Sequence, residues 1–217
     1  MKLSKRLSFI ASFINNNNMI IADIGSDHGY LPYYLLENKI INKAYACDNK
    51  IGPYQNLLST FNNSSFDIEI SLKDGLNNLP DYVNTLIITG MGGDLIIKIL
   101  KRDFKYLKNI EYLILSPHSH FLEVRKYLSS IGYKIIDEGI IKDDKFYQVI
   151  KYQKGNETLN EIELMFGPIL LQKKNVDYLN FYQEELSSIN KLLSLNLPNE
   201  RKNELLKKKE LIENYGK

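Results

Sequence analysis

The chain has 217 residues, of which 44% are hydrophobic and 25% are charged, and its formal net charge is +2. This composition excludes a disordered or fibrous chain and suits one large domain or a domain with an appendage. The single cysteine, Cys47, excludes a disulfide framework within the chain. No segment predicts a signal peptide or a membrane span, so we expect a cytoplasmic protein that does not bind membranes.

Residues 1–21 predict an amphipathic helix with a basic surface. Apolar residues recur there at helical spacing, and the charged residues are Lys2, Lys5 and Arg6, with no acid. A second basic stretch, residues 98–108, holds five basic residues and one acid. Such patches are typical of a face that binds phosphate, although a solvated helix surface is the alternative for each of them.

Apolar runs and amphipathic segments alternate along the chain up to about residue 154. The apolar runs predict strands over residues 19–23, 43–48, 66–75, 83–90 and 111–118. The segments between them predict helices over residues 30–38, 51–63, 92–107 and 120–133. Residues 134–153 contain two β-rich runs joined by KDDK, which predicts an antiparallel hairpin. The expected fold class is therefore α/β, with a mostly parallel sheet and helices on both faces.

The pattern changes towards the C-terminus. Apolar residues follow heptad spacing in residues 176–193, and a second helical pattern follows over residues 205–215. Two helices joined by a short loop predict an antiparallel helical hairpin or a short coiled coil. We therefore expect two domains, residues 1–160 and residues 161–217, the second serving either to bind RNA or to form a dimer. The choice between a monomer and a homodimer stays open.

The segment that follows the first predicted strand, IGSDHGYLP, combines small and acidic residues. Asp23 closes the strand, Gly25 allows a tight turn and a close approach to a ligand, and Gly29 leaves room for the next helix. A dinucleotide loop has the spacing G-x-G-x-x-G, whereas this segment places carboxylates on both sides of the turn. Carboxylates repel a pyrophosphate. They suit a cationic ligand without phosphates, such as S-adenosyl-L-methionine.

Two further carboxylates follow the next two predicted strands. Asp48 lies 19 residues after Gly29, where an acidic residue accepts hydrogen bonds from a ribose diol in nucleotide-binding folds. Asp74, followed by Gly75, is placed to accept a hydrogen bond from an adenine amino group. The alternative is that these aspartates cap helices, but their position at three successive strand ends favours a ligand site.

The segments ADIGSDHGYLP, CDNKIGPYQNL, KDGL, ITGMGGDLIIKIL, GYKIIDE and FGPILL resemble bacterial tRNA adenine-N1 methyltransferases that modify adenine 22. The resemblance extends over nearly the whole chain, and GSDHGYLP with GMGG is more specific than a generic methyltransferase loop. It implies a Rossmann-like methyltransferase domain with a C-terminal helical extension. It also implies S-adenosyl-L-methionine as cofactor, tRNA as partner and 1-methyladenosine as product.

The strand ends then provide candidate residues for each ligand. For the cofactor we expect Asp23, Gly25, Ser26, Asp27, His28, Gly29, Asp48, Asn49, Asp74, Gly75, Gly90 and Met91. For the substrate we expect Lys5, Arg6, Met91, Gly92 and Arg125. Further phosphate contacts are expected from residues 98–108 and from the tail, at Arg201, Lys202, Lys207, Lys208 and Lys209. Tyr30 and Tyr147 are candidates to stack on a base.

The end of the fourth predicted strand, TGMGG, lacks the polar residue, two prolines and aromatic residue that are usual in enzymes acting on exocyclic amino groups. A ring nitrogen such as adenine N1 has its own lone pair and can attack a methyl group directly. The glycines let a base approach and Met91 can pack on its face, although they also suit close packing of the following helix. Asp27 and Asp94 are candidates to take the amino proton of the product, but no catalytic residue is assigned.

The role of His28 and the class of function stay open. His28 either contacts the cofactor or the base, or bonds to nearby backbone. His118 and His120 have no metal-ligand spacing, and we expect no metal site. The functional alternatives are a methyltransferase for a small molecule or protein, a nicotinamide-dependent oxidoreductase, and a non-catalytic RNA-binding module.

Overall fold

The computed structural model describes residues 1–15 and 17–217. In this part of the chain seven strands form one sheet, in the order β3-β2-β1-β4-β5-β7-β6. The strands are β1 Ile21–Ile24, β2 Ala44–Asp48, β3 Ile68–Leu72, β4 Thr85–Thr89, β5 Tyr112–Ser116, β6 Tyr133–Lys142 and β7 Phe146–Lys154. The first five strands pair in parallel, and β7 is antiparallel to both of its neighbours. The predicted mostly parallel sheet and its terminal hairpin are confirmed.

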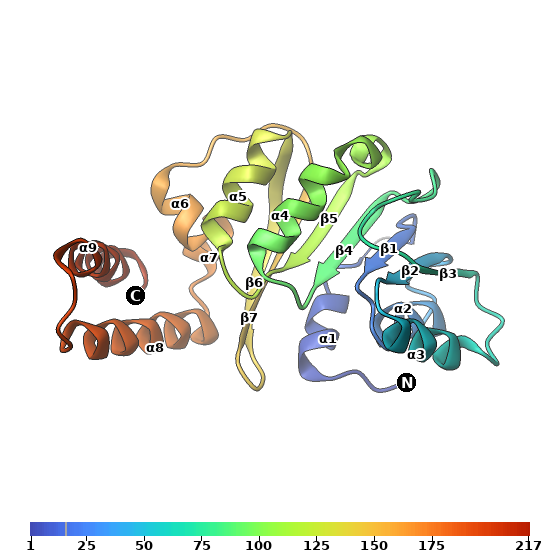
Figure 1. Ribbon diagram of the computed structural model, residues 1–217, viewed down its shortest axis with the longest axis horizontal. Helices are drawn as coiled ribbons and strands as arrows, with labels where there is room; N and C mark the ends of the chain where they lie inside the picture. The colour runs from blue at the N-terminus through green and yellow to red at the C-terminus, as the bar shows by residue number, and fades with distance from the viewer. Residues whose placement is uncertain (16) are drawn as a thin grey trace.

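Helices cover both faces of the sheet (Figure 1). The helices on one face are α1 Lys5–Ala11, α2 Tyr30–Glu37 and α3 Ile51–Phe61, and those on the other are α4 Gly93–Arg102, the 3-10 helix η1 Phe104–Asn109 and α5 Phe121–Ser130. Successive side chains of β1 point to opposite faces of the sheet. Ile21 packs with α1 to α3, whereas Ala22 and Ile24 pack with α4 and α5. Burial on both faces explains why the parallel strands are continuous apolar runs.

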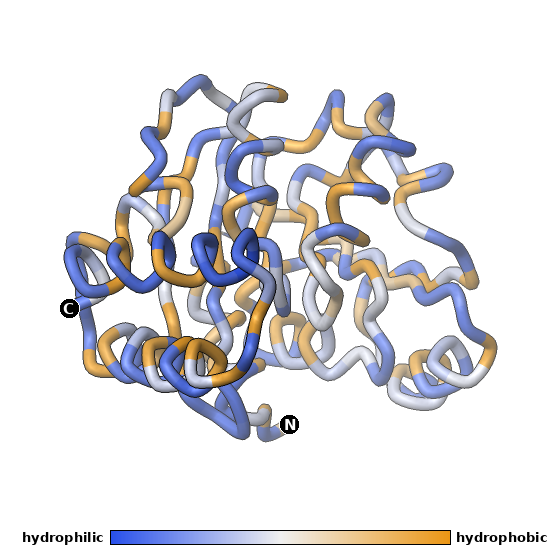
Figure 2. The backbone as a smooth tube through the Cα atoms, turned by 60° about the vertical axis from the view of Figure 1, so that its left-hand side comes forward, coloured by the Kyte–Doolittle hydropathy of each residue, from blue (hydrophilic) through white to orange (hydrophobic). Residues whose placement is uncertain are grey.

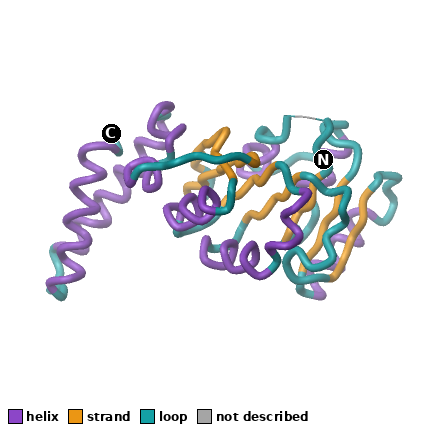
Figure 3. Tube along the Cα trace, turned by 90° about the horizontal axis from the view of Figure 1, so that it is seen from above, coloured by secondary structure: helices purple, strands orange, loops and turns teal. Residues whose placement is uncertain are grey.

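A helical extension lies beyond β6 (Figures 1 and 3). It consists of α6 Glu161–Phe166, α7 Pro168–Lys173, α8 Val176–Leu193 and α9 Asn199–Tyr215. Its own apolar core includes Phe166, Tyr178, Tyr182, Leu205 and Ile212, together with Ile140 of β6. Figure 2 shows hydrophilic and hydrophobic residues alternating along these helices. The C-terminal helices are confirmed, while the coiled-coil geometry and the two-domain division stay predictions.

Several predicted helices end earlier than expected, and two of them differ most. The helix predicted over residues 92–107 stops at Arg102, since Asp103 leaves the helical conformation and the chain continues as η1. The Asp103 carboxylate accepts the backbone N–H of Leu76 at 2.8 Å. The N-terminal helix covers only Lys5–Ala11, although Ile14 beyond it is still buried. No helix among the described residues is long and apolar enough to span a bilayer.

Candidate cofactor and substrate site

The carboxyl ends of β1, β2 and β4 lie side by side, since β1 pairs with both of the other strands. The sheet extends from β1 in both directions, so this edge is a topological switch point, the usual ligand position in open α/β sheets. The loop after β1 is bonded to the end of β2, because the N–H groups of Gly25 and Ser26 donate to Cys47 O at 2.9 and 3.0 Å. The predicted site residues of these two strands are therefore brought together.

Asp23 is a buried carboxylate at the end of β1. Its side chain is only 5% exposed, and Ser26 Oγ donates to its Oδ2 at 2.5 Å. Burial raises the pKa of Asp23 to about 6, and the neighbouring Asp48 carboxylate adds to the increase, while Ser26 and the Arg6 charge oppose it. The surrounding residues thus disfavour the ionised form of Asp23, and a bound cation would favour it.

Asp48, at the end of β2, keeps part of its hydrogen-bonding capacity. Its Oδ1 accepts from Lys50 N at 3.0 Å and its Oδ2 from Asp27 N at 3.3 Å. A carboxylate has about four acceptor positions, so two remain for a ligand such as a diol. Ile51, the first residue of α3, is 65% exposed beside it. Ile51 is not among the predicted site residues; its signal is an apolar residue that starts a helix just after an acidic strand end.

Two glycines have left-handed backbone conformations in the loop after β1. Gly25 has φ +75°, and a Cβ there would lie 2.5 Å from Met91 Cε, so the loops after β1 and β4 touch. Gly29 has φ +69°, and a Cβ there would meet Leu57 at 2.7 Å and Phe61 at 2.9 Å on α3. The close approach expected at Gly25 exists, but the group that occupies it here is the Met91 methyl.

Asp74 is already paired. Arg102 Nη1 donates to its Oδ2 at 2.6 Å, and Asn49 Nδ2 lies 3.4 Å from its Oδ1. Arg102 also donates to both carboxylate oxygens of Asp103, at 2.9 and 2.8 Å. Arg102, expected among the phosphate contacts, instead fixes the loop that carries Asp74 and Gly75, a role that the sequence analysis missed.

The loop after β4 contacts the loop after β5. Met91 O accepts from His118 N at 2.9 Å, and Gly93 N donates to Ser119 O at 3.2 Å. A Cβ on Gly93 would lie 2.5 Å from Ser119 O, so this glycine is required for packing, as the alternative interpretation of TGMGG expects. Gly90 has φ +76°, and a Cβ there would meet no described atom within 4 Å, which leaves space beside Met91.

The other candidates around the site are exposed. His28 stacks on Tyr30 with ring centroids 5.1 Å apart, and its Nε2 lies 3.8 Å from Asp27 Oδ2. Asp94 Oδ2 lies 3.5 Å from His120 Nδ1. In the described ranges, no group of three or more His, Cys, Asp or Glu side chains is arranged to hold a metal ion.

The three basic residues predicted for the substrate separate into two groups. Lys5 Nζ donates to Lys142 O at 2.5 Å, and the Arg6 guanidinium lies over the ring of Tyr147 at 5.1 Å, so both reach the β6–β7 hairpin. Arg125, in contrast, is 0% exposed and paired with Glu138 at 2.8 Å. The prediction that Arg125 contacts tRNA is wrong, because a fully buried guanidinium cannot reach a phosphate.

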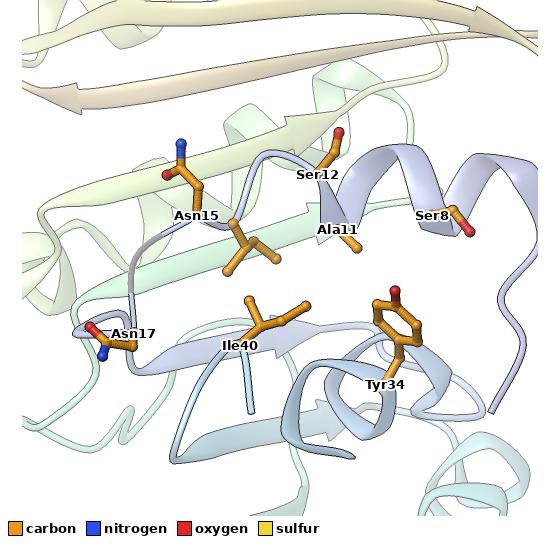
Figure 4. Close-up of a pocket in the computed structure, with 8 residues that line it drawn as sticks. Ser8, Ala11, Ser12, Asn15, Asn17, Tyr34 and Ile40 are labelled. Atoms are coloured by element: carbon orange, nitrogen blue, oxygen red, sulfur yellow. The ribbon is translucent and has the colours of Figure 1, made fainter. Parts of the chain in front are cut away.

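A hollow elsewhere on the surface is lined by no charged side chain among the described residues (Figure 4). It lies between α1, the segment after it and α2, away from the carboxyl ends of the strands. Its lining residues are uncharged: Ser8, Ala11, Ser12, Ile14, Asn15, Asn17, Tyr34 and Ile40. We therefore place the functional site at the strand ends.

Known proteins resemble the chain over most of its length. A family model described as a methyltransferase domain matches residues 3–150. The tRNA (adenine(22)-N(1))-methyltransferase of Bacillus subtilis (strain 168) is 35% identical over 196 residues, which is 86% of this chain and 82% of the relative. The chain belongs to this methyltransferase family. A nicotinamide-dependent oxidoreductase and a non-catalytic RNA-binding module are therefore not supported.

Solved structures extend this membership of the methyltransferase family to the whole fold. Streptococcus pneumoniae Sp1610, in complex with S-adenosyl-L-methionine, is 31% identical with a TM-score of 0.92, covering 100% of both chains. M. capricolum TrmK, in complex with S-adenosyl-homocysteine, is 32% identical with a TM-score of 0.88, covering 100% of this chain and 98% of that one. The predicted Rossmann-like methyltransferase fold is confirmed, with the helical extension inside the matched region.

Proposed function

We propose that this chain transfers a methyl group from S-adenosyl-L-methionine to N1 of adenine 22 in tRNA. The observation that carries the proposal is Asp23, a buried carboxylate at the switch point of a methyltransferase fold that forms no ion pair with any described residue. The identity of 35% to a tRNA (adenine(22)-N(1))-methyltransferase supports the substrate.

The residues at the strand ends fit S-adenosyl-L-methionine in charge and in hydrogen bonding. The cofactor has an ammonium, a sulfonium and a ribose diol, and no phosphate. Asp23 would pair with its positive charge, and the free acceptor positions of Asp48 would bind the diol. The exposed Ile51 would pack on the adenine. Asp74 would act with Asn49 at the rim, although Arg102 already neutralises its charge.

S-adenosyl-L-methionine supplies an electrophilic methyl group when it is bound. The target N1 has a lone pair in the ring plane, so the chain needs no base to create the nucleophile. Its residues are needed to hold the adenine in line and to exclude water. Gly90 leaves backbone space beside Met91, whose side chain would pack on the base. We assign no catalytic acid or base.

The tRNA would approach the edge that carries the strand ends, α1 and the β6–β7 hairpin. The extension is a weaker candidate by charge, since residues 161–217 hold nine basic and nine acidic residues. Most of its predicted phosphate contacts form ion pairs: Arg201 with Glu204, Lys207 with Glu161, Lys208 with Glu185 and Lys209 with Glu213. Adenine N1 is hidden in a base pair, so the target base must be unpaired or flipped out. The protein would act on tRNA in the cytoplasm.

The test is mass spectrometry of nucleosides from a tRNA transcript incubated with the protein and S-adenosyl-L-methionine. We expect 1-methyladenosine at position 22 and none in a transcript that carries guanosine there. Asp48→Ala should weaken cofactor binding and slow methylation, whereas Lys43→Ala, at the opposite edge of the sheet, should do neither. Absence of 1-methyladenosine, or its persistence in the substituted transcript, would contradict the proposal.

A further inference from the structure

The tip of the β6–β7 hairpin, residues 142–147, lies at the same edge of the sheet as the strand-end carboxylates (Figure 1). Because β7 is antiparallel to β5, its first residues lie beside the last residues of β5, and the Ser116 hydroxyl donates to Gln148 O at 2.9 Å. His118, in the loop after β5, donates its N–H to Met91 O at 2.9 Å. The hairpin tip is therefore a neighbour of the loop that we assign to the target base.

Two cations lie over the ring of Tyr147 at this tip. Arg6 Cζ is 5.1 Å from the ring centroid and Lys145 Nζ is 5.3 Å from it, distances at which a cation is attracted to the ring. The Tyr147 hydroxyl donates to Asp144 Oδ1 at 2.7 Å, and the His118 ring meets the tyrosine ring edge-on at 6.2 Å. Tyr147 is only 6% exposed, so it is a fixed platform for both cations.

Neither cation at Tyr147 is held in an ion pair with a described carboxylate, although the Tyr147 hydroxyl and the nearby Lys145 charge help to lower the pKa of Asp144. Within residues 1–15 and 17–217, neither the Arg6 guanidinium nor the Lys145 ammonium forms an ion pair. The acids of the tip bond elsewhere, Asp143 to the backbone N–H of Arg6 at 3.0 Å and Asp144 to the Tyr147 hydroxyl. Two cations on one ring, neither of them in an ion pair within the described chain, suit an anion that both can contact.

The same two cations act on the groups around the methyl-transfer site. Burial and the charges of Lys145 and Arg6 lower the pKa of His118, so the imidazole is neutral at physiological pH and adds no repulsion. The Arg6 charge also opposes the raised pKa of Asp23. The Arg6 charge therefore acts on the Asp23 carboxylate at the strand ends as well as on the His118 imidazole.

We propose that Arg6 and Lys145 bind a backbone phosphate next to the target adenine, and that Tyr147 is the positioning residue that holds both cations. A guanidinium donates two parallel N–H bonds to a phosphate, and a lysine adds a mobile point charge. The inference rests on the proposed function, because the phosphate belongs to the tRNA substrate. The proposed phosphate site differs from a general basic surface because it is confined to the two cations on one tyrosine ring.

The test measures binding of a tRNA transcript by fluorescence anisotropy over a range of salt concentrations, with Lys145→Ala as the main variant. Lys145 is exposed, so its removal should leave the fold intact. We expect roughly tenfold weaker binding and a salt dependence that is shallower by about one phosphate contact. KM for tRNA should rise to a similar extent with kcat little changed, and S-adenosyl-L-methionine affinity by calorimetry should stay the same. Arg6→Ala should weaken tRNA binding comparably.

Two controls separate the site from a general charge effect. Lys43→Ala removes another lysine that lies over a tyrosine, 4.3 Å from the Tyr82 ring, but at the amino end of β2, and it should bind tRNA like the wild type. Tyr147→Phe keeps the ring and should be close to the wild type, whereas Tyr147→Leu should resemble Lys145→Ala.

The possible results of these measurements distinguish failure of the phosphate site from failure of the proposed function. If wild-type protein methylates tRNA but Lys145→Ala binds it with unchanged affinity and salt dependence, this inference is wrong and the proposed function stands. Equal losses in Lys145→Ala and Lys43→Ala, or a loss of cofactor affinity in Lys145→Ala, would also overturn it. If the wild-type protein neither binds nor methylates tRNA, the proposed function fails and this inference fails with it.

Discussion

Two of the regions where this molecule buries charged side chains do so in opposite ways. At the junction with the extension, Arg125 and Glu138 are both 0% exposed and lie 2.8 Å apart. Around them, Arg125 also donates to Leu164 O at 3.1 Å, and Glu138 Oε2 accepts from Ile169 N at 3.1 Å. At the end of β1, Asp23 is buried with the Ser26 hydroxyl as donor and a second carboxylate nearby.

The difference separates a structural charge from a functional one. The buried pair at the junction is saturated by its own chain, so it holds α6 and α7 against β6 and leaves nothing for a ligand. The Asp23 carboxylate is held in an environment that favours protonation, which is a typical property of a site built for a cation. Burial of charge marks a ligand site only when the chain leaves that charge uncompensated.

The largest expected effect comes from breaking the saturated pair. Glu138→Gln leaves the Arg125 charge buried without its counter-charge, and we expect the free energy of unfolding to fall by about 3–5 kcal/mol. Urea unfolding followed by circular dichroism measures it. Replacing both residues with apolar ones, Arg125→Met with Glu138→Leu, should recover most of the loss. If Glu138→Gln and the wild type are equally stable, the buried Arg125–Glu138 pair is not the structural charge pair described here.

Asp23→Asn should raise the free energy of unfolding, which is the opposite of the effect expected for Glu138→Gln. The pKa of Asp23 rises from 3.8 to about 6 on folding, so between these values the native state binds more protons than the unfolded state. The free energy of unfolding therefore falls as pH rises through this window, and the loss is complete above about pH 7. Removing the ionisable group should stabilise the ligand-free protein there by up to about 3 kcal/mol, and by less near pH 4.5.

Thermal or urea unfolding of Asp23→Asn and wild type at both pH values checks this prediction. Cofactor affinity should fall in the same variant, because the negative charge is lost. A variant that is less stable than the wild type near neutral pH would mean that the carboxylate is a structural group like Glu138.

A smaller effect tests the contact between the loops after β1 and β4. Gly25→Ala places a Cβ at a positive φ and against Met91 Cε, and should lower the free energy of unfolding by about 1–2 kcal/mol and weaken cofactor binding. The matched control is Gly52→Ala, at an open position in α3, which should stabilise by about 0.5–1 kcal/mol. Similar effects of the two substitutions in urea unfolding would argue against a tight contact at Gly25.

The smallest effect is expected at an exposed ion pair. Lys207 Nζ lies 2.9 Å from Glu161 Oε1, with both side chains about two-thirds exposed. Lys207→Ala should change the free energy of unfolding by less than about 1 kcal/mol, because water already solvates both charges. A loss as large as that of Glu138→Gln in the same assay would show that burial is not what distinguishes the two pairs.

The strand-end site could be predicted because its signals are local. Each parallel strand is a run of apolar residues, and Asp23 and Asp48 interrupt the pattern where the chain must turn. The hairpin was equally local, with a polar turn between two β-rich runs. These features depend on neighbours in the sequence, which is why composition and spacing are enough to find them.

The roles of Arg125 and Lys151 depend on contacts between distant segments and were missed. A weak signal existed for Arg125, which falls on the apolar stripe of α5 with Val124 and Leu128. Lys151 is 5% exposed in β7, and its Nζ donates to Phe13 O at 2.8 Å, a partner that no local pattern identifies. The partner of a buried charge is known only once the fold has brought the two segments together.

The central claim is that the Asp23 carboxylate gains its charge when the cationic cofactor binds. Calorimetric titration with S-adenosyl-L-methionine at about pH 6, in buffers of different ionisation enthalpy, measures the protons released on binding. The account predicts proton release that is absent in Asp23→Asn and fades by about pH 8, because the free carboxylate is then already ionised. Binding without proton release near pH 6, or the same release in the variant, would contradict it.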